Sequence, residues 1–590
     1  MAKQITRRAH VDDQHLPAQL HPVIKQVYAS RGIHSSEDLD LVVNQLSGVK
    51  SLHQALKGID KACQILQQAF ITKEPIVIVG DFDADGATST ALMMEGLAIM
   101  GCDHHSFLVP NRFEYGYGLT PEIVDIAAAK GAKIIVTVDN GISCIAGVAK
   151  AKAYGMKVIV TDHHLPGQTL PDADAIVNPN QNDCDFESKS LAGVGVAFYL
   201  MMALRKTLRE ADYFNQHGLA EPNIAQLLDL VALGTVADVV PLDKNNRILV
   251  AQGLKRIRAG QTRPGIQALI EVAGRNQQQL VASDFGFALG PRINAAGRLD
   301  DMSLGIFCLL APDLGSARAM AADLDDLNKA RREIEQGIQV EAERVMASLN
   351  LDAVEPGNLP NAIALYQSDW HQGVIGIVAG RLKEKFHRPS IVFANASDDI
   401  AEQSDTELLI KGSARSIPGL HIRDLLERID TLYPDLIDKF GGHAMAAGLS
   451  IKQADFSQFQ TVFNEQATLA LKPEDLQQVI LTDGELSASD MTLSFAELLR
   501  DSGPWGQQFP EPLFDDEFIL VQQKIVGEKH LKLVVEKQNQ VFDAIAFNID
   551  VKAWPNPRAK HIRLVYRLDV NEFRGKRTVQ LMVDDLSCAE

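Results

Sequence analysis

The sequence lacks several features that would place the protein in a specialised class. Its six cysteines are widely spaced and form no Cys-x-x-Cys pair, which argues against a zinc module or a disulfide framework and favours the reducing cytoplasm. It has no apolar run long enough to span a bilayer, and no apolar stretch follows the basic residues near its start, so we expect neither a membrane partner nor a secretory signal. A chain of 590 residues is too long for one core, which predicts about three or four domains.

Positive charge is also scarce. The formal net charge of −19 argues against binding a polyanion, because affinity for nucleic acid comes largely from Lys and Arg on phosphates. Two facts weaken that objection: a cluster of metal-binding acids is neutralised once cations bind, and residues 550–580 contain eight Lys or Arg against three acids. Bulk charge therefore leaves the partner open.

Short apolar runs rich in β-branched residues predict buried parallel strands, because each is too short for a helix and apolar on both faces. Segments of helical pattern separate and follow them, which predicts a doubly wound α/β domain. The expected strands are residues 76–80, 133–138 and 157–161, and the expected helices are residues 88–100, 121–130, 144–154, 193–209 and 224–237.

The rest of the chain divides by pattern. A charged, Ala-rich stretch predicts a long connecting helix, a second α/β lobe follows with strands at 362–366 and 390–393 and helices at 374–386 and 422–428, and a final strand-rich segment predicts a small antiparallel barrel. The expected divisions are a mostly helical region at 1–70, a catalytic domain at 71–312, the connecting helix at 313–350, the second lobe at 351–468 and the barrel at 469–590.

Acids follow the apolar runs of the first lobe. The first run leads into Asp81-Phe-Asp-Ala-Asp-Gly, the second into Asp139-Asn-Gly and the third into Asp162-His-His, while Asp238 follows the apolar residues 230–237. Ligands of open α/β sheets bind outside the carboxyl ends of the strands, so these groups are expected to converge in one crevice.

Clustered carboxylates repel one another unless cations lie between them. Oxygen ligands suit Mg²⁺ or Mn²⁺, an imidazole favours Mn²⁺, and two ions roughly 3.5–4 Å apart can activate water for phosphoryl transfer. A lone Asp after a strand is more often a helix cap, and Asp-x-Asp-x-Asp-Gly could open a calcium loop, but Met93 stands where that loop needs Glu. The combination of three acidic sites therefore favours a metal centre.

These motifs resemble those that define the DHH phosphoesterase family. The strings at 79–90, 110–119, 234–242 and 292–298 are similar to the RecJ branch of that family, those at 412–416 and 441–448 to its DHHA1 domain, and that at 503–514 to the segment before its OB-fold. The resemblance covers nearly the whole chain and implies a single-stranded-DNA-specific exonuclease that works from 5′ to 3′, releases mononucleotides and acts in DNA repair and recombination.

The resemblance also implies roles for individual residues. Two divalent ions, Mn²⁺ preferred or Mg²⁺, would be held by Asp83, Asp85, Asp139, His163 and Asp238. His164 would face the scissile phosphate with Asp162 orienting it, and Asp81 is either a further ligand or a neighbour of the ligands. The implied substrate contacts are Ser413, Arg415, Ser416 and His443 for the nucleotide and terminal phosphate, and Arg112, Arg292 and Arg298 near the cleft.

The barrel offers Arg563, Arg567, Arg574 and Tyr566 for binding single-stranded DNA, because single-strand binders combine basic grooves with stacking aromatics. That these arginines form a solvated face and Tyr566 lies in the core is an equally good interpretation. The segment Gly193-Val-Gly-Val is interpreted as helix packing, since a dinucleotide loop would need a third glycine directly after a strand.

Two other functions share parts of this pattern. A DHH phosphoesterase for short oligonucleotides or cyclic dinucleotides would not need the barrel and the connector, and a non-catalytic DNA-binding scaffold would be expected to lose metal ligands, whereas the set here is complete. Besides single-stranded DNA, a single-strand-binding protein and a helicase are the partners that we expect.

Overall fold

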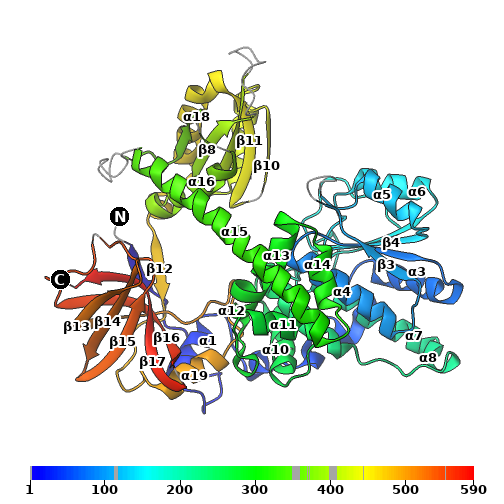
Figure 1. Cartoon of the computed structure of the whole chain (residues 1–590), viewed down its shortest axis with the longest axis horizontal. Helices are drawn as coiled ribbons and strands as arrows, with labels where there is room; N and C mark the ends of the chain where they lie inside the picture. The colour runs from blue at the N-terminus through cyan, green and yellow to red at the C-terminus, as the bar shows by residue number, and fades with distance from the viewer. Residues whose placement is uncertain are drawn as a thin grey trace. The chain divides into compact units, whose positions relative to one another are not determined.

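The computed structural model describes residues 3–111, 117–348, 359–368, 370, 372–396, 408–442, 444–551, 553–573 and 575–589. Two compact units make up the chain (Figure 1): one combines Met1–Arg7 with Ala330–Thr482, and the other combines Arg8–Lys329 with Asp483–Glu590. None of the helices within these ranges is long and apolar enough to cross a membrane.

The second of these units contains a five-stranded parallel sheet. Its order is β3-β2-β4-β5-β6, so the chain crosses over rather than running from neighbour to neighbour. The three predicted strands are confirmed, whereas two edge strands were missed because one is half polar and the other has only three residues. The bounds are β2 Ile76–Val79, β3 His105–Leu108, β4 Ile134–Val138, β5 Lys157–Thr161 and β6 Ala175–Val177.

Helices cover both faces of this sheet (Figure 1), and alternate strand residues enter two separate cores. In β2, Ile76 and Ile78 pack with α3, α4 and α7, whereas Val77 and Val79 pack with α5 and α6. The helices of this unit include α3 Ile59–Thr72, α4 Ala84–Ile99, α5 Pro121–Ala129, α6 Ile145–Ala153, α7 Gly193–Glu210, α9 Leu228–Ala237 and α10 Lys244–Arg258. Helix α4 begins four residues before the predicted start.

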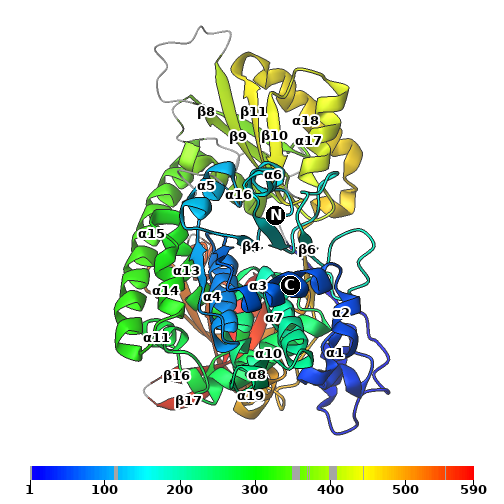
Figure 2. The ribbon, with the colours of Figure 1, turned by 90° about the vertical axis from the view of Figure 1, so that its right-hand side faces the viewer.

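The predicted second α/β lobe is a mixed sheet in the order β10-β11-β9-β8-β7, in which only β7 and β8 run parallel. Helix α16 packs on one face through Val392 and Ala394, and α17 and α18 pack on the other through Ile391 and Phe393 (Figure 2). The bounds are β7 Ile363–Tyr366, α16 Gln372–Phe386, β8 Ser390–Asn395, β9 Leu409–Arg415, α17 Ile422–Leu432, β10 Lys439–Gly442, β11 Ala446–Lys452 and α18 Phe456–Ala470.

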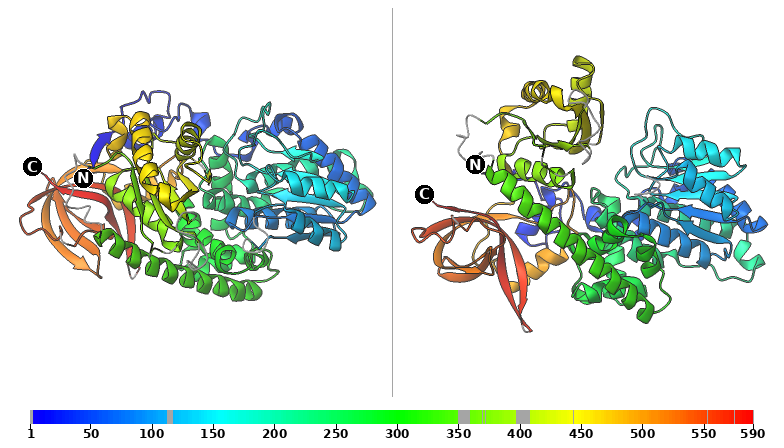
Figure 3. Two further views of the ribbon diagram at one scale, coloured as in Figure 1. Left: turned by 90° about the horizontal axis from the view of Figure 1, so that it is seen from above. Right: turned by 45° about the horizontal axis from the view of Figure 1, so that its top comes forward.

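The strand-rich segment forms a closed five-stranded barrel, in the order β13-β14-β15-β17-β16 (Figure 3). The expectation of a wholly antiparallel barrel is wrong at one seam, because β15 and β17 pair in parallel to close it. The strands are β13 Phe514–Val526, β14 His530–Lys537, β15 Gln540–Ala546, β16 His561–Phe573 and β17 Lys576–Cys588.

The first region of the chain is mostly helical, as expected, but it opens with a strand. This strand, β1 Gln4–Arg7, pairs in parallel with β12 Val479–Thr482, a partner too distant in sequence for any local pattern to reveal. The predicted connecting helix is confirmed as α15 Leu314–Ser348, a single helix of 35 residues.

Candidate metal centre

The acids that follow the strands converge, as the sequence predicts. Asp139 and Asp162 come directly after β4 and β5, and Asp81 comes two residues after β2. Asp238 arrives differently, because the apolar stretch before it is helix α9, which this residue caps at the C-terminus. Potential ligand atoms within 4.8 Å of one another form three groups: Asp139, His163 and His164; Asp85, His163 and Asp238; and Asp81, Asp83 and Asp139.

Helix starts position the acids of the first loop. Asp83 is the N-cap of α4 and accepts a hydrogen bond from the Gly86 amide at 2.9 Å, so the capping interpretation and the metal interpretation hold together. Asp85 is buried in the first turn, and its two oxygens accept hydrogen bonds from the amides of Gly193 and Val194 at 2.6 and 2.9 Å. The N-terminus of α7 thus fixes the Asp85 carboxylate.

The segment Gly193-Val-Gly-Val begins the buried helix α7, as the helix-packing interpretation predicts, and its amides also hold Asp85. A Cβ on Gly193 would lie 2.5 Å from the Oδ1 atom of Asp139, so only glycine lets α7 approach the acids this closely. Asp139 itself has a φ of 61°, in the left-handed region that Asp tolerates better than most residues. Its neighbour Asn140 donates to the carbonyls of Val79 and Val138, which ties the ends of β2 and β4 together.

Among the described residues of the crevice, a carboxylate oxygen and an imidazole nitrogen are buried without a hydrogen-bond partner. They are Oδ1 of Asp139 and Nε2 of His163, which lie 3.2 Å apart, and Nε2 also lies 3.5 Å from Oδ2 of Asp238. Burying an unsatisfied polar atom costs about 1–3 kcal/mol, and a divalent cation would satisfy both atoms at once. The residues present therefore fit a metal centre.

Protonation in the crevice supports this fit. Burial is the largest cause of raised carboxyl pKa values here, and the charge of neighbouring acids is the next. The pKa of Asp81 and of Asp85 rises to about 7, that of Asp238 rises to about 9, and that of Asp139 rises well above its usual value. Burial, and then the charge of His164, lowers the pKa of His163 to about 4, so this imidazole is neutral and offers a lone pair. Crowded carboxylates and a neutral imidazole are the ligands expected around divalent ions.

His164 differs from its neighbour. Its Nδ1 atom lies 2.7 Å from Oδ1 of Asp162, and this carboxylate also accepts the backbone amides of His163, His164 and Ile142. Burial disfavours the charged imidazole, but the hydrogen bond to Asp162 and the surrounding acids outweigh it and raise the pKa of His164 to about 9. A partly exposed, protonated imidazole at this position can bind a phosphate oxygen.

Four residues that hold the centre together had no predicted role. The side-chain amides of Asn178 and Asn180, after β6, donate to the carbonyls of His164 and His163 at 2.9 and 2.6 Å. Asn294 accepts the Ala84 amide at 2.7 Å, and the Tyr117 hydroxyl donates to the Asp139 carbonyl at 3.3 Å. Asn294 and Tyr117 lie inside strings that carry the family resemblance, whereas the two asparagines follow a strand that was not predicted.

The arginines expected near the cleft differ in their exposure to solvent. Arg292 is buried in α13 Gly290–Leu299 and forms an ion pair with Asp325 of α15 at 2.8 Å, and its role as a DNA anchor stays a prediction. Arg298 is exposed at the end of the same helix, next to Gly297, where a Cβ would collide with the carbonyl of Phe82 in the metal-binding loop. Arg112 lies outside the described residues.

In the second lobe, Arg415 on β9 donates to the hydroxyl of Ser413 at 3.1 Å and to the Ala414 carbonyl at 2.8 Å. Burial lowers the pKa of Arg415. Ser416 is buried and its hydroxyl donates to the Leu420 carbonyl at 2.7 Å, and its contact with substrate stays a prediction. His443 lies outside the described residues.

The barrel residues are paired with acids. Tyr566 is fully buried and its hydroxyl donates to Asp516 at 2.6 Å, so the prediction that it stacks on a base is wrong. Arg563 binds Asp515 at 2.6 Å, and Arg567 binds Asp584 and Glu511 at 2.8 and 3.4 Å. The basic face expected from the sequence is therefore largely neutralised at these two arginines, while Arg574 lies outside the described residues.

Comparisons with known proteins agree with this arrangement. The family model described as "DHH family, N-terminal domain" matches residues 75–235, the DHHA1 domain matches residues 359–468 and the RecJ OB domain matches residues 482–585. The first match covers the sheet with the strand-end acids, the second covers the mixed sheet and the third covers the barrel.

Similar proteins span nearly the whole chain. A "Single-stranded-DNA-specific exonuclease RecJ" from Salmonella typhimurium is 57% identical over 99% of this chain and 99% of its own length. Crystal structures of RecJ from Thermus thermophilus in complex with Mn²⁺ and with Mg²⁺ match with TM-scores of 0.75 and 0.70, at 28% and 26% identity, over the whole of this chain and 80% and 79% of theirs. The chain belongs to the RecJ family of metal-dependent DHH nucleases.

Proposed function

We propose that this protein is a single-stranded-DNA-specific exonuclease that hydrolyses phosphodiester bonds with two divalent ions, Mn²⁺ preferred or Mg²⁺. The observation that carries the proposal is the pair of unpartnered buried atoms, Oδ1 of Asp139 and Nε2 of His163, among converging acids. The relatives named as single-stranded-DNA-specific exonucleases support the choice of substrate.

Each side chain of the centre has a task in this reaction. Asp83, Asp85, Asp139, His163 and Asp238 hold the ions, and Asp81 is close enough to join them. When bound, the ions supply an activated water and stabilise charge on the entering and leaving oxygens. The amides of α7 keep Asp85 in place. The protonated His164, oriented by Asp162, donates a hydrogen bond to the scissile phosphate, where negative charge increases during the reaction.

The direction of digestion extends this proposal. Degradation from the 5′ end with release of mononucleotides requires a contact for the terminal phosphate, and Arg415, Ser413 and His443 are the proposed group. The partly exposed Arg415 offers a guanidinium whose described contacts are to a hydroxyl and a carbonyl rather than to an acid. A charge-assisted hydrogen bond is worth roughly 1.5–3 kcal/mol, so Arg415→Ala should raise KM about tenfold or more for 5′-phosphorylated strands.

A digestion experiment tests substrate, metal and direction together. Single-stranded and duplex DNA, labelled at either end and carrying a 5′ phosphate or a 5′ hydroxyl, is incubated with Mn²⁺, with Mg²⁺ or with EDTA. The proposal predicts metal-dependent loss of the single strand from its 5′ end, with mononucleotide products. Preference for duplexes, or for very short oligonucleotides alone, would contradict it, and release from the 3′ end would contradict the direction.

The setting of this activity is part of the proposal. Action in DNA repair and recombination in the cytoplasm would bring the enzyme to strands coated by a single-strand-binding protein and opened by a helicase. Digestion of a long strand is measured with and without each partner. If neither partner changes the rate or associates with the full-length chain, these partnerships are wrong.

A further inference from the structure

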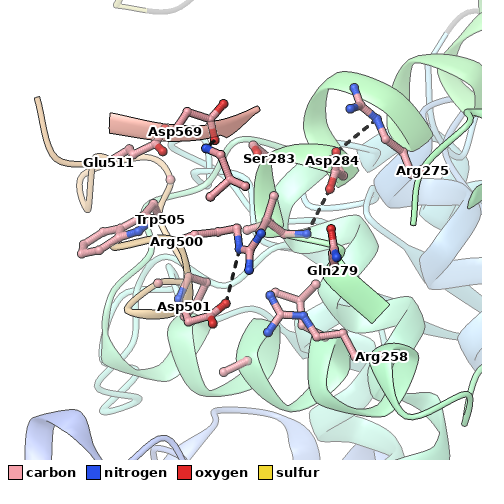
Figure 4. Close-up of a pocket in the computed structure, with 18 of the residues that line it drawn as sticks. Arg258, Arg275, Gln279, Ser283, Asp284, Arg500, Asp501, Trp505, Glu511 and Asp569 are labelled. Carbon is pink, nitrogen blue, oxygen red and sulfur yellow. Dashed lines mark hydrogen bonds and ion pairs between the residues drawn. The ribbon is translucent and has the colours of Figure 1, made fainter. Parts of the chain in front are cut away.

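A cavity of about 1200 Å³ lies within the unit Arg8–Lys329 plus Asp483–Glu590, outside the metal centre (Figure 4). Helix α10 and α12 Ala282–Asp284 line it on one side, and the segment after α19 Leu493–Asp501 lines it with part of the barrel on the other. The volume exceeds that of a typical small-molecule pocket. The cavity is therefore large enough to hold a drug-sized small molecule.

The pocket is locally basic in an acidic protein. Its lining contains five basic and four acidic side chains, and three of the acids already bind a cation at 3.2 to 3.5 Å: Asp284 with Arg275, Asp501 with Arg500, and Glu511 with Arg567. Arg258 donates its Nε hydrogen to the Leu280 carbonyl at 2.7 Å. Within the described chain, neither Arg258 nor Lys255, one turn earlier on α10, forms an ion pair with an acid.

Arg258 is thus a half-buried cation without an acid in contact. Burial lowers its pKa, the charge of Asp501 opposes this most, the charge of Arg500 adds to the lowering and the charge of Asp284 opposes it. Figure 4 shows Arg258 and Arg500 on neighbouring walls of the pocket. Desolvating a cation is costly unless an anion compensates it, so an anionic ligand would be favoured here.

An exposed aromatic ring accompanies these cations. Phe287 lines the same pocket and is 78% exposed, whereas Phe285 and Leu289 beside it are fully buried. These residues form a π-helix, η6 Phe285–Leu289, whose wider turn is common at functional sites. The other aromatic of the lining, Trp505, already stacks on Phe509 at 5.2 Å, so Phe287 is the ring with a free face.

The same segment reaches the metal centre. The π-helix continues directly into α13, which carries the Asn294 that accepts the Ala84 amide of the metal-binding loop. At the junction, Gly290 packs against Ala237, the residue before Asp238. One continuous helical segment thus joins the pocket to two of the loops that hold the acids.

We propose that this pocket binds one nucleotide unit, with its phosphate on Arg258 and Lys255 and its base against Phe287. Cations beside a free aromatic face are the combination by which proteins bind single strands. The inference rests on the proposed function, because the nucleotide is either an internal unit of the single-stranded substrate or a free mononucleotide. These two sources share the chemistry of one phosphate and one planar ring.

The test uses the full-length protein with EDTA, so that strands bind without being cut. The variants are Phe287→Leu, Lys255→Gln and Arg258→Gln, and the matched controls are Phe307→Leu, an exposed phenylalanine on α14 Ser303–Leu309, and Arg318→Gln, an exposed arginine on α15. Fluorescence anisotropy measures binding of a long oligothymidylate and of a tetranucleotide, and calorimetry measures binding of thymidine monophosphate. Melting temperatures check each fold.

The proposal predicts that Phe287→Leu weakens binding of the long strand by roughly tenfold, because stacking on an aromatic ring contributes that much per base. Lys255→Gln should weaken it as well, because a phosphate contact is lost. The controls should bind like the unchanged protein. Loss of thymidine monophosphate binding in the same variants would identify a free nucleotide as a ligand, whereas loss for the long strand alone would identify the strand as the source.

Unchanged affinity for both ligands in Phe287→Leu and Lys255→Gln would overturn the proposal, even if Arg258→Gln fails to fold. Hydrolysis of the tetranucleotide with Mn²⁺ keeps this outcome separate from the proposed function. A variant that cuts the short substrate normally but binds long strands weakly supports the pocket. If the unchanged protein cannot cut at all, the proposed function itself fails.

Discussion

The metal crevice and the barrel both bury charged groups, but they treat them in opposite ways. In the crevice, acids of the same sign lie together, and Asp139 and His163 keep buried atoms without partners. In the barrel, the buried carboxylate of Asp516 accepts hydrogen bonds from Lys537, Tyr566 and the Leu486 amide. The two sites therefore differ in what surrounds a buried carboxylate, which is other acids in the crevice and a cation with hydrogen-bond donors in the barrel.

The sharpest way to break this comparison is to remove a ligand. Asp139→Asn should reduce hydrolysis roughly 1,000-fold or more, because ion-dependent stabilisation of the transition state is worth several kcal/mol. The same change should raise the melting temperature in EDTA, because it removes one of several repelling carboxylates. Initial rates and thermal melting are measured on the same preparation. Unaltered hydrolysis would mean that the crevice is not the catalytic centre.

The equivalent change in the barrel should act on stability instead. Asp516→Ala leaves Lys537 and the Tyr566 hydroxyl buried without their partner, which should cost about 3 kcal/mol of unfolding free energy. Hydrolysis of a short oligonucleotide per folded molecule should not change. Denaturant unfolding followed by tryptophan fluorescence measures the first effect. A loss of turnover at unchanged stability would place Asp516 in the reaction and undo the contrast.

Metal binding should stabilise the crevice and not the barrel. Mn²⁺ at a hundred times its Kd should raise the unfolding free energy by about 2.7 kcal/mol, because it binds the folded state. In His163→Ala this gain in unfolding free energy should shrink. In Asp516→Ala the gain should persist, although the unfolding free energy without metal is lower. Melting curves at increasing Mn²⁺ concentration give both values. An equal gain in all three proteins would show that the ions bind elsewhere.

The smallest effect is expected at the basic strand of the barrel. Arg567 is already paired with Asp584 and Glu511, so Arg567→Gln should leave the salt dependence of single-strand binding nearly unchanged. By contrast, replacing an arginine that contacts a phosphate would lower the slope of log affinity against log salt concentration by about one. Binding of a long strand is measured at several salt concentrations. A clear drop in slope would show that Arg567 exchanges its acids for DNA.

Sequence reasoning located the acids because they follow recognisable strands. The β-branched runs before Asp81, Asp139 and Asp162 predict buried parallel strands, and parallel strands bring their carboxyl ends together. Asp238 was grouped with these acids because it follows an apolar stretch, and the resemblance then made it a ligand, but that stretch is the helix α9 rather than a strand. The sequence therefore predicted those parts of the metal centre that directly follow a strand of the parallel sheet.

Burial and pairing of side chains were harder to predict than the position of the acids. Arg292, Ser416 and Tyr566 look available in the sequence, but each is buried against a partner set by tertiary structure. The partner of Tyr566 is Asp516, which is 50 residues away in the sequence. The helical or strand periodicity of a local segment cannot reveal a contact over that separation. Asn178 and Asn180 were missed for a related reason, because an amide that supports a backbone carbonyl leaves no recurring pattern.

The pairing of β1 with β12 has a consequence for the order of events during synthesis. Gln4–Arg7 is translated before every strand of the parallel sheet, whereas its partner Val479–Thr482 is translated after all of them. At about 5–20 residues per second, β1 waits roughly half a minute or longer before β12 is made. The unit that contains both strands therefore cannot be completed while the parallel sheet is being translated, and the hydrogen bonds between β1 and β12 form only after β12 has been made.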